Sequence, residues 1–437
     1  MENSIWTENV TLPAFEALNG ELKTDVLIVG GGLAGLLCAY ALKEDGVDYA
    51  LIEADRIMRG VTRNTTAKIT SQHGLVYHKL RRRFGAEKAK LYYRANEQAL
   101  EQYAAMAQKI DCDFQWQDSI VYASDFTDTL VEEMGALEEL GIPAEFSDST
   151  DLPVKTAGGV CFRDQAQFHP LKFAAGITAD LRIFEQTAAK QFEGNRVITD
   201  RGTITAQKII VATHFPMINK HGMYFLKQYQ SRSYVLGLEN AVPVDEMYVD
   251  ESDKGLSFRN FGDLLLLGGG GHRTGKPGGG WKELEDFARR HYPDARIRCR
   301  WAAQDCMTLD DLPYIGQYSP RTPNLYVATG FNKWGMTNSM AAANVLRDLV
   351  QGRENVYADL FSPSRRILRP QLGRNAAEAV KGLLTVTKPR CPHMGCALHW
   401  NPQEHSWDCS CHGSRFTENG KLLDNPATDD INISRSD

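Results

Sequence analysis

Short runs of apolar residues predict the central elements of an α/β protein. The run Val26–Val29 predicts a buried strand, because four consecutive apolar residues leave neither face of the strand polar. A helix is predicted over Leu33–Lys43, and two more buried strands are predicted at 208–213 (KIIVAT) and 324–329 (NLYVAT). Because these strands lie far apart in the sequence, we expect a parallel sheet assembled from distant pieces of chain.

The segments between these strands have other patterns. Residues 114–124 (FQWQDSIVYAS) alternate like a half-buried strand, and residues 81–108 are predicted to be helical. We therefore expect a discontinuous Rossmann-like α/β domain with an inserted α+β domain for the substrate. The approximate boundaries are 22–75, 155–215 and 300–360 for the first domain, and 76–154 and 216–299 for the second, within a region of 1–364.

The pattern changes after Phe361. Residues 365–382 are basic and weakly patterned, which predicts a linker with at most one short helix. Residues 383–437 are expected to form a small all-β module, in which LLTVT at 383–387 is the first predicted strand.

Composition narrows the classes of function. The 437 residues are 43% hydrophobic and 24% charged, as in ordinary globular proteins, and a net charge of −6 argues against a nucleic-acid partner. The N-terminus does not resemble a signal peptide, and no apolar run reaches the ~18 residues that an integral membrane segment needs. We expect a cytoplasmic protein, in which clustered cysteines bind metal or do redox chemistry.

A glycine motif follows the first predicted strand. Gly30 allows the tight turn, Gly32 lets the backbone approach a diphosphate, and Gly35 lets the helix pack against the strand. A carboxylate that closes the next strand can accept hydrogen bonds from ribose hydroxyls. The motif predicts a dinucleotide site rather than an ordinary tight turn, with contacts from Gly30, Gly32, Leu33, Ala34, Gly35 and Glu53.

Four segments together resemble a known family of flavoenzymes. Residues 24–53, 59–70 (RGVTRNTTAKIT), 208–214 and 324–346 are similar in order and spacing to FAD-dependent oxidoreductases of the D-amino-acid oxidase and glycine oxidase superfamily. The resemblance implies FAD as cofactor, with a late helix pointing its N-terminus at the flavin. Further FAD contacts that it implies are Thr62, Thr65, Val197, Thr213, Gly330, Gly335, Met336 and Thr337, for which the alternative is ordinary turn chemistry.

Two features depart from that family. The third strand ends in Ala212-Thr213-His214 where a glycine is usual, so His214 is either beside the cofactor or a surface residue. The arginine that usually grips a substrate carboxylate is not evident in 300–316, where Trp301 stands near the expected place. An ordinary α-amino acid substrate is therefore disfavoured.

Residues 391–414 hold four of the nine cysteines together with four histidines. Two Cys/His pairs on separate loops can clamp one metal centre, and tetrahedral zinc is the simplest occupant. CPHMGC and CSCHGS, however, resemble the Rieske [2Fe-2S] family. The resemblance implies Cys391 and Cys409 on one iron, His393 and His412 on the other, and a disulfide between Cys396 and Cys411; His399 and His405 are expected to be solvated.

The resemblance also bears on the redox potential and on the scaffold of the module. Ser414 matches a hydroxyl donor to the cluster, whereas Phe416 stands where high-potential members have tyrosine, so we expect a lower potential. Rieske domains usually build about three strands before the first ligand, which takes roughly 30 residues. Only 26 residues run from Arg365 to Arg390, so the module is predicted to be shortened, with a minimal scaffold, borrowed strands or no assembled cluster.

These features favour an FAD-dependent dehydrogenase. A small amine-like or other organic substrate would give a hydride to FAD, and electrons would pass singly to the [2Fe-2S] cluster and on to a protein or quinone acceptor. The alternatives are an electron-transfer or redox-sensing protein acting with a protein partner, and a simple flavin oxidase with a non-functional module. His73 and His272 are weak catalytic candidates, whereas His169 beside Pro170 is expected to cap a helix.

Overall fold

This computed structural model describes residues 3–252, 255–366, 370–386 and 389–433. The strands on either side of the glycine motif belong to a mixed eight-stranded sheet. Its strands are β1 (Gly20–Val29), β2 (Tyr49–Ile52), β9 (Ile183–Phe184), β10 (Ala189–Glu193), β11 (Arg196–Thr199), β12 (Gly202–Val211), β18 (Tyr314–Gln317) and β19 (Leu325–Thr329). β1 pairs in parallel with β2 and β12, and β12 pairs in parallel with β19. The predicted parallel sheet from distant pieces of chain is confirmed.

Helices pack against this sheet, and one of them begins directly after the glycine motif. They are α1 (Leu33–Glu44), α5 (Pro170–Thr178), α8 (Gly335–Val350) and α9 (Ala358–Phe361). Leu36 and Leu37 of α1 are buried in the same core as Val345 of α8, which explains why α1 is apolar around most of its circumference. His169 caps α5 as expected, since its Nδ1 accepts from the Lys172 amide at 3.3 Å.

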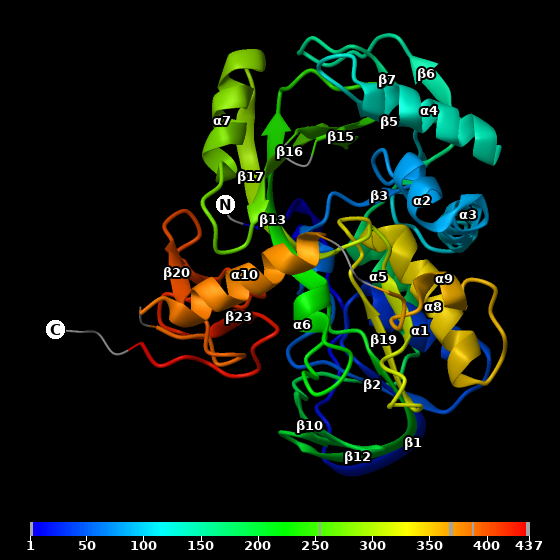
Figure 1. Cartoon of the computed structure of the whole chain (residues 1–437), viewed down its shortest axis with the longest axis vertical. Helices are drawn as coiled ribbons and strands as arrows, with labels where there is room; N and C mark the ends of the chain where they lie inside the picture. The colour runs from blue at the N-terminus through cyan, green and yellow to red at the C-terminus, as the bar shows by residue number, and fades with distance from the viewer. Residues whose placement is uncertain (1–2, 253–254, 367–369, 387–388, 434–437) are drawn as a thin grey trace.

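A second sheet forms the upper part of the molecule in Figure 1. Its spatial order is β17 (Arg296–Thr308), β13 (Gln228–Glu239), β16 (Leu264–Arg273), β15 (Ser257–Phe261), β14 (Met247–Asp250), β5 (Ser119–Tyr122), β7 (Gly159–Phe162) and β6 (Glu145–Ser147). β7 thus lies in the second sheet, although its residues fall in a piece assigned from sequence to the first domain. β17 likewise runs on to Thr308.

Smaller elements pack against the two sheets or connect their strands. They are η1 (Ile5–Thr7), η2 (Val61–Asn64), α2 (Tyr77–Phe84), α3 (Ala86–Ala107), α4 (Asp128–Leu140), α6 (Tyr224–Lys227), α7 (Gly280–His291), and a three-stranded sheet of β3 (Lys68–Ile69), β8 (Ala166–Gln167) and β4 (Gln115–Trp116). The predicted helical stretch 81–108 is divided at Gly85, whose φ of +85° ends α2. No helix in the described part of the chain has the length and hydropathy of a membrane span.

The C-terminal module is an antiparallel four-stranded sheet preceded by a helix. Its elements are α10 (Pro370–Leu384), β20 (Leu398–Asn401), β21 (Ser406–Cys409), β22 (Arg415–Thr417) and β23 (Leu422–Asp424). The strand predicted at 383–387 is wrong: Leu383 and Leu384 end α10, Thr385 and Val386 have no regular structure, and residue 387 lies outside the described residues. The linker is also more ordered than expected, because NAAEAVKGLL is rich in good helix formers.

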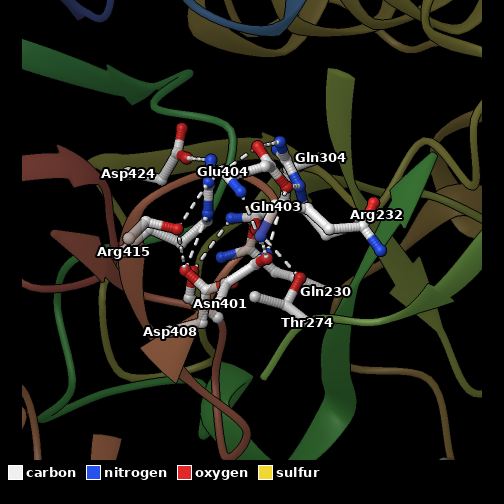
Figure 2. A network of polar contacts seen from close by, with 12 residues as sticks. Gln230, Arg232, Thr274, Gln304, Asn401, Gln403, Glu404, Asp408, Arg415 and Asp424 are labelled. Atoms are coloured by element: carbon white, nitrogen blue, oxygen red, sulfur yellow. Dashed lines mark hydrogen bonds and ion pairs between the residues drawn. The ribbon is translucent and has the colours of Figure 1, made fainter. Parts of the chain in front are cut away.

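The module lies against β13 and α6 (Figure 1), and a buried ionic network joins it to the second sheet. The Glu404 carboxylate accepts from Arg232 of β13 and from Arg415 of β22, and all three side chains are less than one-tenth exposed (Figure 2). Arg415 also binds Asp408 at 3.0 Å and Asp424 at 3.0 Å. Although burial opposes ionisation, Arg232 and Arg415 hold the pKa of Glu404 below its ordinary value.

Replacing Glu404 tests how strongly this network holds the module. Glu404→Gln leaves two buried guanidinium groups without their shared carboxylate, so we expect a loss of about 3 kcal/mol in the free energy of unfolding of the C-terminal module. Denaturant titration, followed by tryptophan fluorescence and by proteolytic release of the module, measures it. Asp286→Asn is the matched control, because Asp286 pairs with Lys282 and Arg289 at an exposed position and should change stability by at most about 1 kcal/mol. Equal stabilities of the two variants would contradict the prediction.

Candidate functional site

A cavity of about 920 Å³ lies between the two large sheets. This volume is near the upper end of the range for ligand pockets, roughly 300–1,000 Å³. Its wall includes the glycine turn after β1, the loop before α8, and strands β13 and β17. The C-terminal module closes one side, since residues 421–425, 427 and 428 also line the cavity.

The glycine turn is shaped to receive a diphosphate. Gly30 has a φ of +113°, and a Cβ there would lie 2.6 Å from the carbonyl oxygen of Ala212. Gly32, in contrast, has open space, with Thr62 Oγ1 as the nearest atom at 3.7 Å from an added Cβ. Gly32 and Leu33 at the start of α1 line the cavity, so the positive end of the helix dipole faces a bound anion.

Glu53 lies where the sequence predicts a ribose contact. It lines the cavity, and its carboxylate accepts from the amides of Gly31 at 2.7 Å and Asp55 at 3.0 Å. Burial raises its pKa, and these amide hydrogen bonds oppose that shift. The donor set and the open Gly32 cradle fit the adenosine and diphosphate portion of a dinucleotide.

Most of the remaining residues expected to bind the cofactor also come together around this cavity. Those that line it are Ala34, Thr62, Thr65, Thr213, Gly330, Gly335 and Met336. Gly35 lies behind the turn, and the Thr337 hydroxyl is buried in a hydrogen bond to the Thr70 carbonyl at 3.1 Å. Val197 is fully buried in β11 and does not line the cavity; residues 186–190 of the neighbouring segment do.

His73 faces the cavity in a fixed, neutral form. Its Nδ1 lies 2.6 Å from the Tyr92 hydroxyl, its Nε2 lies 2.8 Å from the Thr70 carbonyl oxygen, and its ring stacks on Trp334. The carbonyl can only accept, so Nε2 carries the proton and Nδ1 accepts from Tyr92. Burial lowers the pKa of His73 to about 3, so the ring is uncharged near neutral pH.

His272 is outside the cavity wall. Its Nε2 lies 2.9 Å from the Tyr234 hydroxyl, its Nδ1 lies 3.0 Å from the Arg273 carbonyl, and its ring stacks on Tyr234. His214, by contrast, lines the cavity in a left-handed conformation with φ of +64°. Of the two alternatives for His214, the structure therefore supports the position beside the cofactor site.

Two charged cavity residues were not identified from the sequence. Trp301, near the place expected for a gripping arginine, is buried and donates to the Asn64 carbonyl, whereas Asp305 four residues later lines the cavity. Lys68 of β3 also lines it, and burial lowers its pKa to about 7. Strand alternation in RWAAQDCMT could have pointed to Asp305, because Ala303, Asp305 and Met307 share one face.

The four predicted cluster ligands converge at the edge of the C-terminal module. The Cys391 and Cys409 thiols are close enough to shift each other's pKa, and the Nδ1 atoms of His393 and His412 are 3.2 Å apart. Burial lowers the pKa of His393 to about 4 and of His412 to about 3, so both rings are neutral, as metal ligands must be. With the Nε2 of His393 hydrogen-bonded to Asn219 Oδ1 at 2.9 Å, its Nδ1 lone pair is free to bind iron.

Cys396 and Cys411 form the expected disulfide between the two ligand loops. Helix α10 packs behind it, with Gly382 so close that an added Cβ would meet the Cys411 sulfur. Cys409 Sγ lies within 4.8 Å of both disulfide sulfurs, but disulfide sulfurs are not thiolates and do not act as ligands. His399 and His405 are both exposed, His399 on strand β20 rather than in a loop.

Ser414 and Phe416 lie beside the cluster site. Ser414 is fully buried, its hydroxyl helps to lower the pKa of the nearby Cys391 thiol, and its Oγ accepts from the Ala427 amide at 3.0 Å. Phe416 is fully buried in the core of the module and provides no polar atom. Of these two positions, only Ser414 therefore provides a hydroxyl group near the cluster cysteines.

One residue layer separates the cluster ligands from the cavity. Phe215 is fully buried, and its ring centroid lies 6.4 Å from that of His393 and 6.5 Å from that of His412. Its chain neighbours Thr213 and His214 line the cavity. The histidine side of the module is therefore turned toward the cavity.

Glutamines of the second sheet hold this orientation. Gln230 Nε2 donates to the His412 carbonyl at 2.9 Å, and Gln304 Nε2 donates to the Gly413 carbonyl at 2.9 Å and to Gln230 Oε1 (Figure 2). Thr274 donates in turn to Gln304 Oε1 at 2.9 Å. The ligand loop is thus bound to the second sheet through its backbone.

Comparison with known proteins identifies both parts of the chain. Residues 25–349 match the family model described as FAD dependent oxidoreductase, and residues 366–434 match the model of the Rieske [2Fe-2S] domain. The chain is 33% identical over 485 aligned residues to YhfW of Bacillus subtilis (strain 168), designated a Rieske 2Fe-2S iron-sulfur protein, covering 97% of this chain and 95% of the relative.

Two further relatives match only the larger part. Gamma-glutamylputrescine oxidoreductase of Escherichia coli (strain K12) is 24% identical over 393 residues, which cover 79% of this chain and 88% of the relative. The crystal structure of glycine oxidase from Geobacillus kaustophilus superimposes with a TM-score of 0.67 at 20% identity, covering 79% of this chain and all of the neighbour. The similarity to glycine oxidase shows the fold, and it supports the expected α/β and α+β architecture.

Adding a hydroxyl at Phe416 should raise the potential of the cluster. Phe416→Tyr supplies a second donor, and a hydrogen bond of about 1 kcal/mol corresponds to a one-electron shift on the order of 40 mV. Ser414→Ala should shift the potential down by a similar amount. A redox titration followed by electron paramagnetic resonance measures both; a Phe416→Tyr potential equal to or below the parent value would refute the prediction.

The buried neutral His73 should make stability pH-dependent. The unfolded chain binds a proton at His73 below about pH 6.5 that the folded protein excludes, so stability falls on acidification. We expect His73→Asn to remove about 2 kcal/mol of the loss in unfolding free energy between pH 7 and pH 5. Denaturant titrations at the two pH values measure this, and His405→Asn, at an exposed position, controls for the loss of an imidazole. An unchanged pH slope in His73→Asn would contradict the assignment.

Proposed function

Because the chain belongs to the FAD-dependent oxidoreductase family and also carries a Rieske [2Fe-2S] domain, we propose that it is a dehydrogenase with a built-in one-electron relay. A small amine-like or other organic substrate loses a hydride to FAD and a proton to the surroundings. The two electrons then leave singly through the [2Fe-2S] cluster to an external acceptor, a protein or a quinone, so the cluster is reduced twice in each turnover.

The observation that carries this proposal is the inward orientation of the cluster ligands. His412 is 2% exposed and His393 is only partly exposed, and both rings contact Phe215, which follows the cavity-lining pair Thr213 and His214. In Rieske clusters the histidines hold one of the two irons, so His393 and His412 would hold that iron at the side of the module that faces the cavity. This arrangement favours transfer within the chain.

The cavity wall supports the same proposal. Asn425 lines the cavity, accepts from Gln230 through its carbonyl oxygen at 2.9 Å, and donates from its side chain to the Phe215 carbonyl at 3.0 Å. Gln230 in turn holds the His412 carbonyl. A module that is part of the flavin site is suited to fixed electron transfer rather than to diffusing between partners.

The residues of the cavity favour catalysis by positioning. His73 is neutral and engaged at both ring nitrogens, so its role is to orient neighbouring groups rather than to take a proton. The N-terminus of α8, which begins at Gly335 and lines the cavity with Met336, provides positive potential that would stabilise negative charge on a reduced flavin.

We place the reaction in the cytoplasm. Five cysteines outside the C-terminal module, at 38, 112, 161, 299 and 306, are buried free thiols, which suits a reducing compartment. The acceptor is then a cytoplasmic redox protein or a quinone that reaches the protein from a membrane surface.

A reduction experiment on the full chain tests the relay. We expect anaerobic photoreduction of the flavin to be followed by a rhombic cluster signal in electron paramagnetic resonance, with two irons and one FAD per chain. Cys391→Ala should lose this signal and keep FAD, because the disulfide and the Glu404 ion pairs still hold the module. Slow reoxidation of the reduced flavin by oxygen in the parent and faster H₂O₂ production in the variant would agree with a dehydrogenase.

The two alternatives give different results in the same experiment. A parent protein with FAD and no iron that makes H₂O₂ rapidly is a simple oxidase with a non-functional module. A protein with both cofactors that no small amine reduces, but that a protein donor does, is an electron-transfer or redox-sensing protein.

A further inference from the structure

Asp305 occupies a distinctive place in the cavity wall. It lies on β17 opposite Ser231 of β13, and it lines the cavity together with Ala303 and Met307. Gln304, the next residue, points to the other side of the strand and binds the C-terminal module. The carboxylate is therefore directed into the cavity by the alternation of a well-paired central strand.

The other carboxylates that line the cavity already have partners. Glu53 accepts from backbone amides, Asp55 pairs with Arg59, Asp250 accepts from the Ser252 amide, Glu251 from Thr127, Asp311 pairs with Arg83, and Asp424 pairs with Arg415. The Asp305 side chain has no hydrogen-bond or ion-pair partner among the residues that the structure describes, and it is only partly exposed. A partly buried carboxylate without a partner is suited to a ligand that supplies one.

The positive groups near Asp305 do not fill that role. Arg232 is bound to Glu404, with Nε to Oε1 at 3.0 Å. His214 is neutral, because burial lowers its pKa, and its Nε2 has no hydrogen-bond partner among the described residues. Lys333 lies in the loop before α8, with no carboxylate within 4.0 Å in the described structure.

We propose that Asp305 binds a positively charged nitrogen of the substrate, so that the cavity selects organic ammonium compounds over carboxylates. The inference rests on the proposed dehydrogenase function and specifies its substrate class. Asp305 is thus a specificity-determining residue. Where related enzymes use an arginine to bind a substrate carboxylate, this cavity has a carboxylate that would bind a cation.

Lys68 is the competing feature. It is 8% exposed, lines the same cavity, and in the described structure hydrogen-bonds only to the Thr66 hydroxyl at 3.4 Å. Nearby Arg259 is also buried, with its guanidinium bound to the carbonyls of Thr66 and Ala67. If this positive end of the cavity determined selectivity, carboxylates would bind best, so the two features predict opposite ligand charges.

Ligand binding to the flavin-loaded full chain distinguishes them. n-Butylamine, n-butyrate and n-butanol have similar shapes and carry a positive, a negative and no charge at pH 7. Dissociation constants come from the anaerobic perturbation of the flavin absorption spectrum and, independently, from calorimetry. We expect butylamine to bind at least about tenfold more tightly than butyrate, because hydrogen bonds to a charged group contribute this much or more.

Variants assign the effect to one carboxylate. Asp305→Asn should weaken butylamine binding by at least about tenfold and leave butanol binding unchanged. Asp311→Asn is the matched control, because Asp311 lines the same cavity but is already paired with Arg83, and it should leave butylamine binding unchanged. Lys333→Met should strengthen butylamine binding by removing a competing cation.

Two results would overturn the inference: tighter binding of butyrate that Lys68→Met abolishes, or butylamine binding that is the same in Asp305→Asn as in the parent. Both are separable from failure of the proposed function. Transfer from photoreduced flavin to the cluster needs no substrate, so its absence would refute the relay while leaving the binding result interpretable.

Discussion

Side chains alternate across the antiparallel pair β13 and β17, and this alternation determines which side chains bind the C-terminal module and which line the cavity. Gln230, Arg232 and Gln304 project to one side, where they bind the backbone and the Glu404 carboxylate of the C-terminal module. Asp305 projects to the other side, into the cavity. The strand pair thus presents one face to the module and the other to the cavity, and a slip of one residue in strand register would exchange the two faces.

The ionic network around Glu404 is better understood as a determinant of orientation than as a source of stability. Burying two arginines and two carboxylates, Glu404 and Asp408, costs desolvation energy that their mutual attraction only partly offsets. The same charges, however, allow a single docking geometry, because any other would leave a buried guanidinium without its carboxylate. Docking in this geometry turns His393 and His412 toward Phe215 and puts residues 421–425 in the cavity wall.

The same interface explains how the module folds although it is shorter than usual Rieske domains. In the described residues between Arg365 and Arg390, helix α10 takes the place of the strands that a Rieske domain usually has. The helix backs the disulfide, and β13 and β17 support the ligand loop through Gln230 and Gln304. Of the alternatives left open by the sequence, the described residues have a minimal scaffold: the sheet of the module contains only its own four strands, and the larger part of the chain supports it through side-chain hydrogen bonds rather than through borrowed strands.

The sequence by itself determined the local features that depend on residue types close together in the chain. The glycine turn, its flanking strands, the cluster ligands and the Cys396–Cys411 disulfide could be predicted, because each depends on residue type at short spacing or on a close family resemblance. The helix at 370–384 was predicted only as one short helix within the linker, and its last residues were assigned to a strand because apolar residues there also suit a strand. Only the tertiary structure decided that Asp305 lacks a partner, that Val197 is buried away from the cavity, and that the cluster histidines face inward. These features depend on how strands distant in sequence come together. A local sequence pattern does not show which side chains are left without a partner by that arrangement.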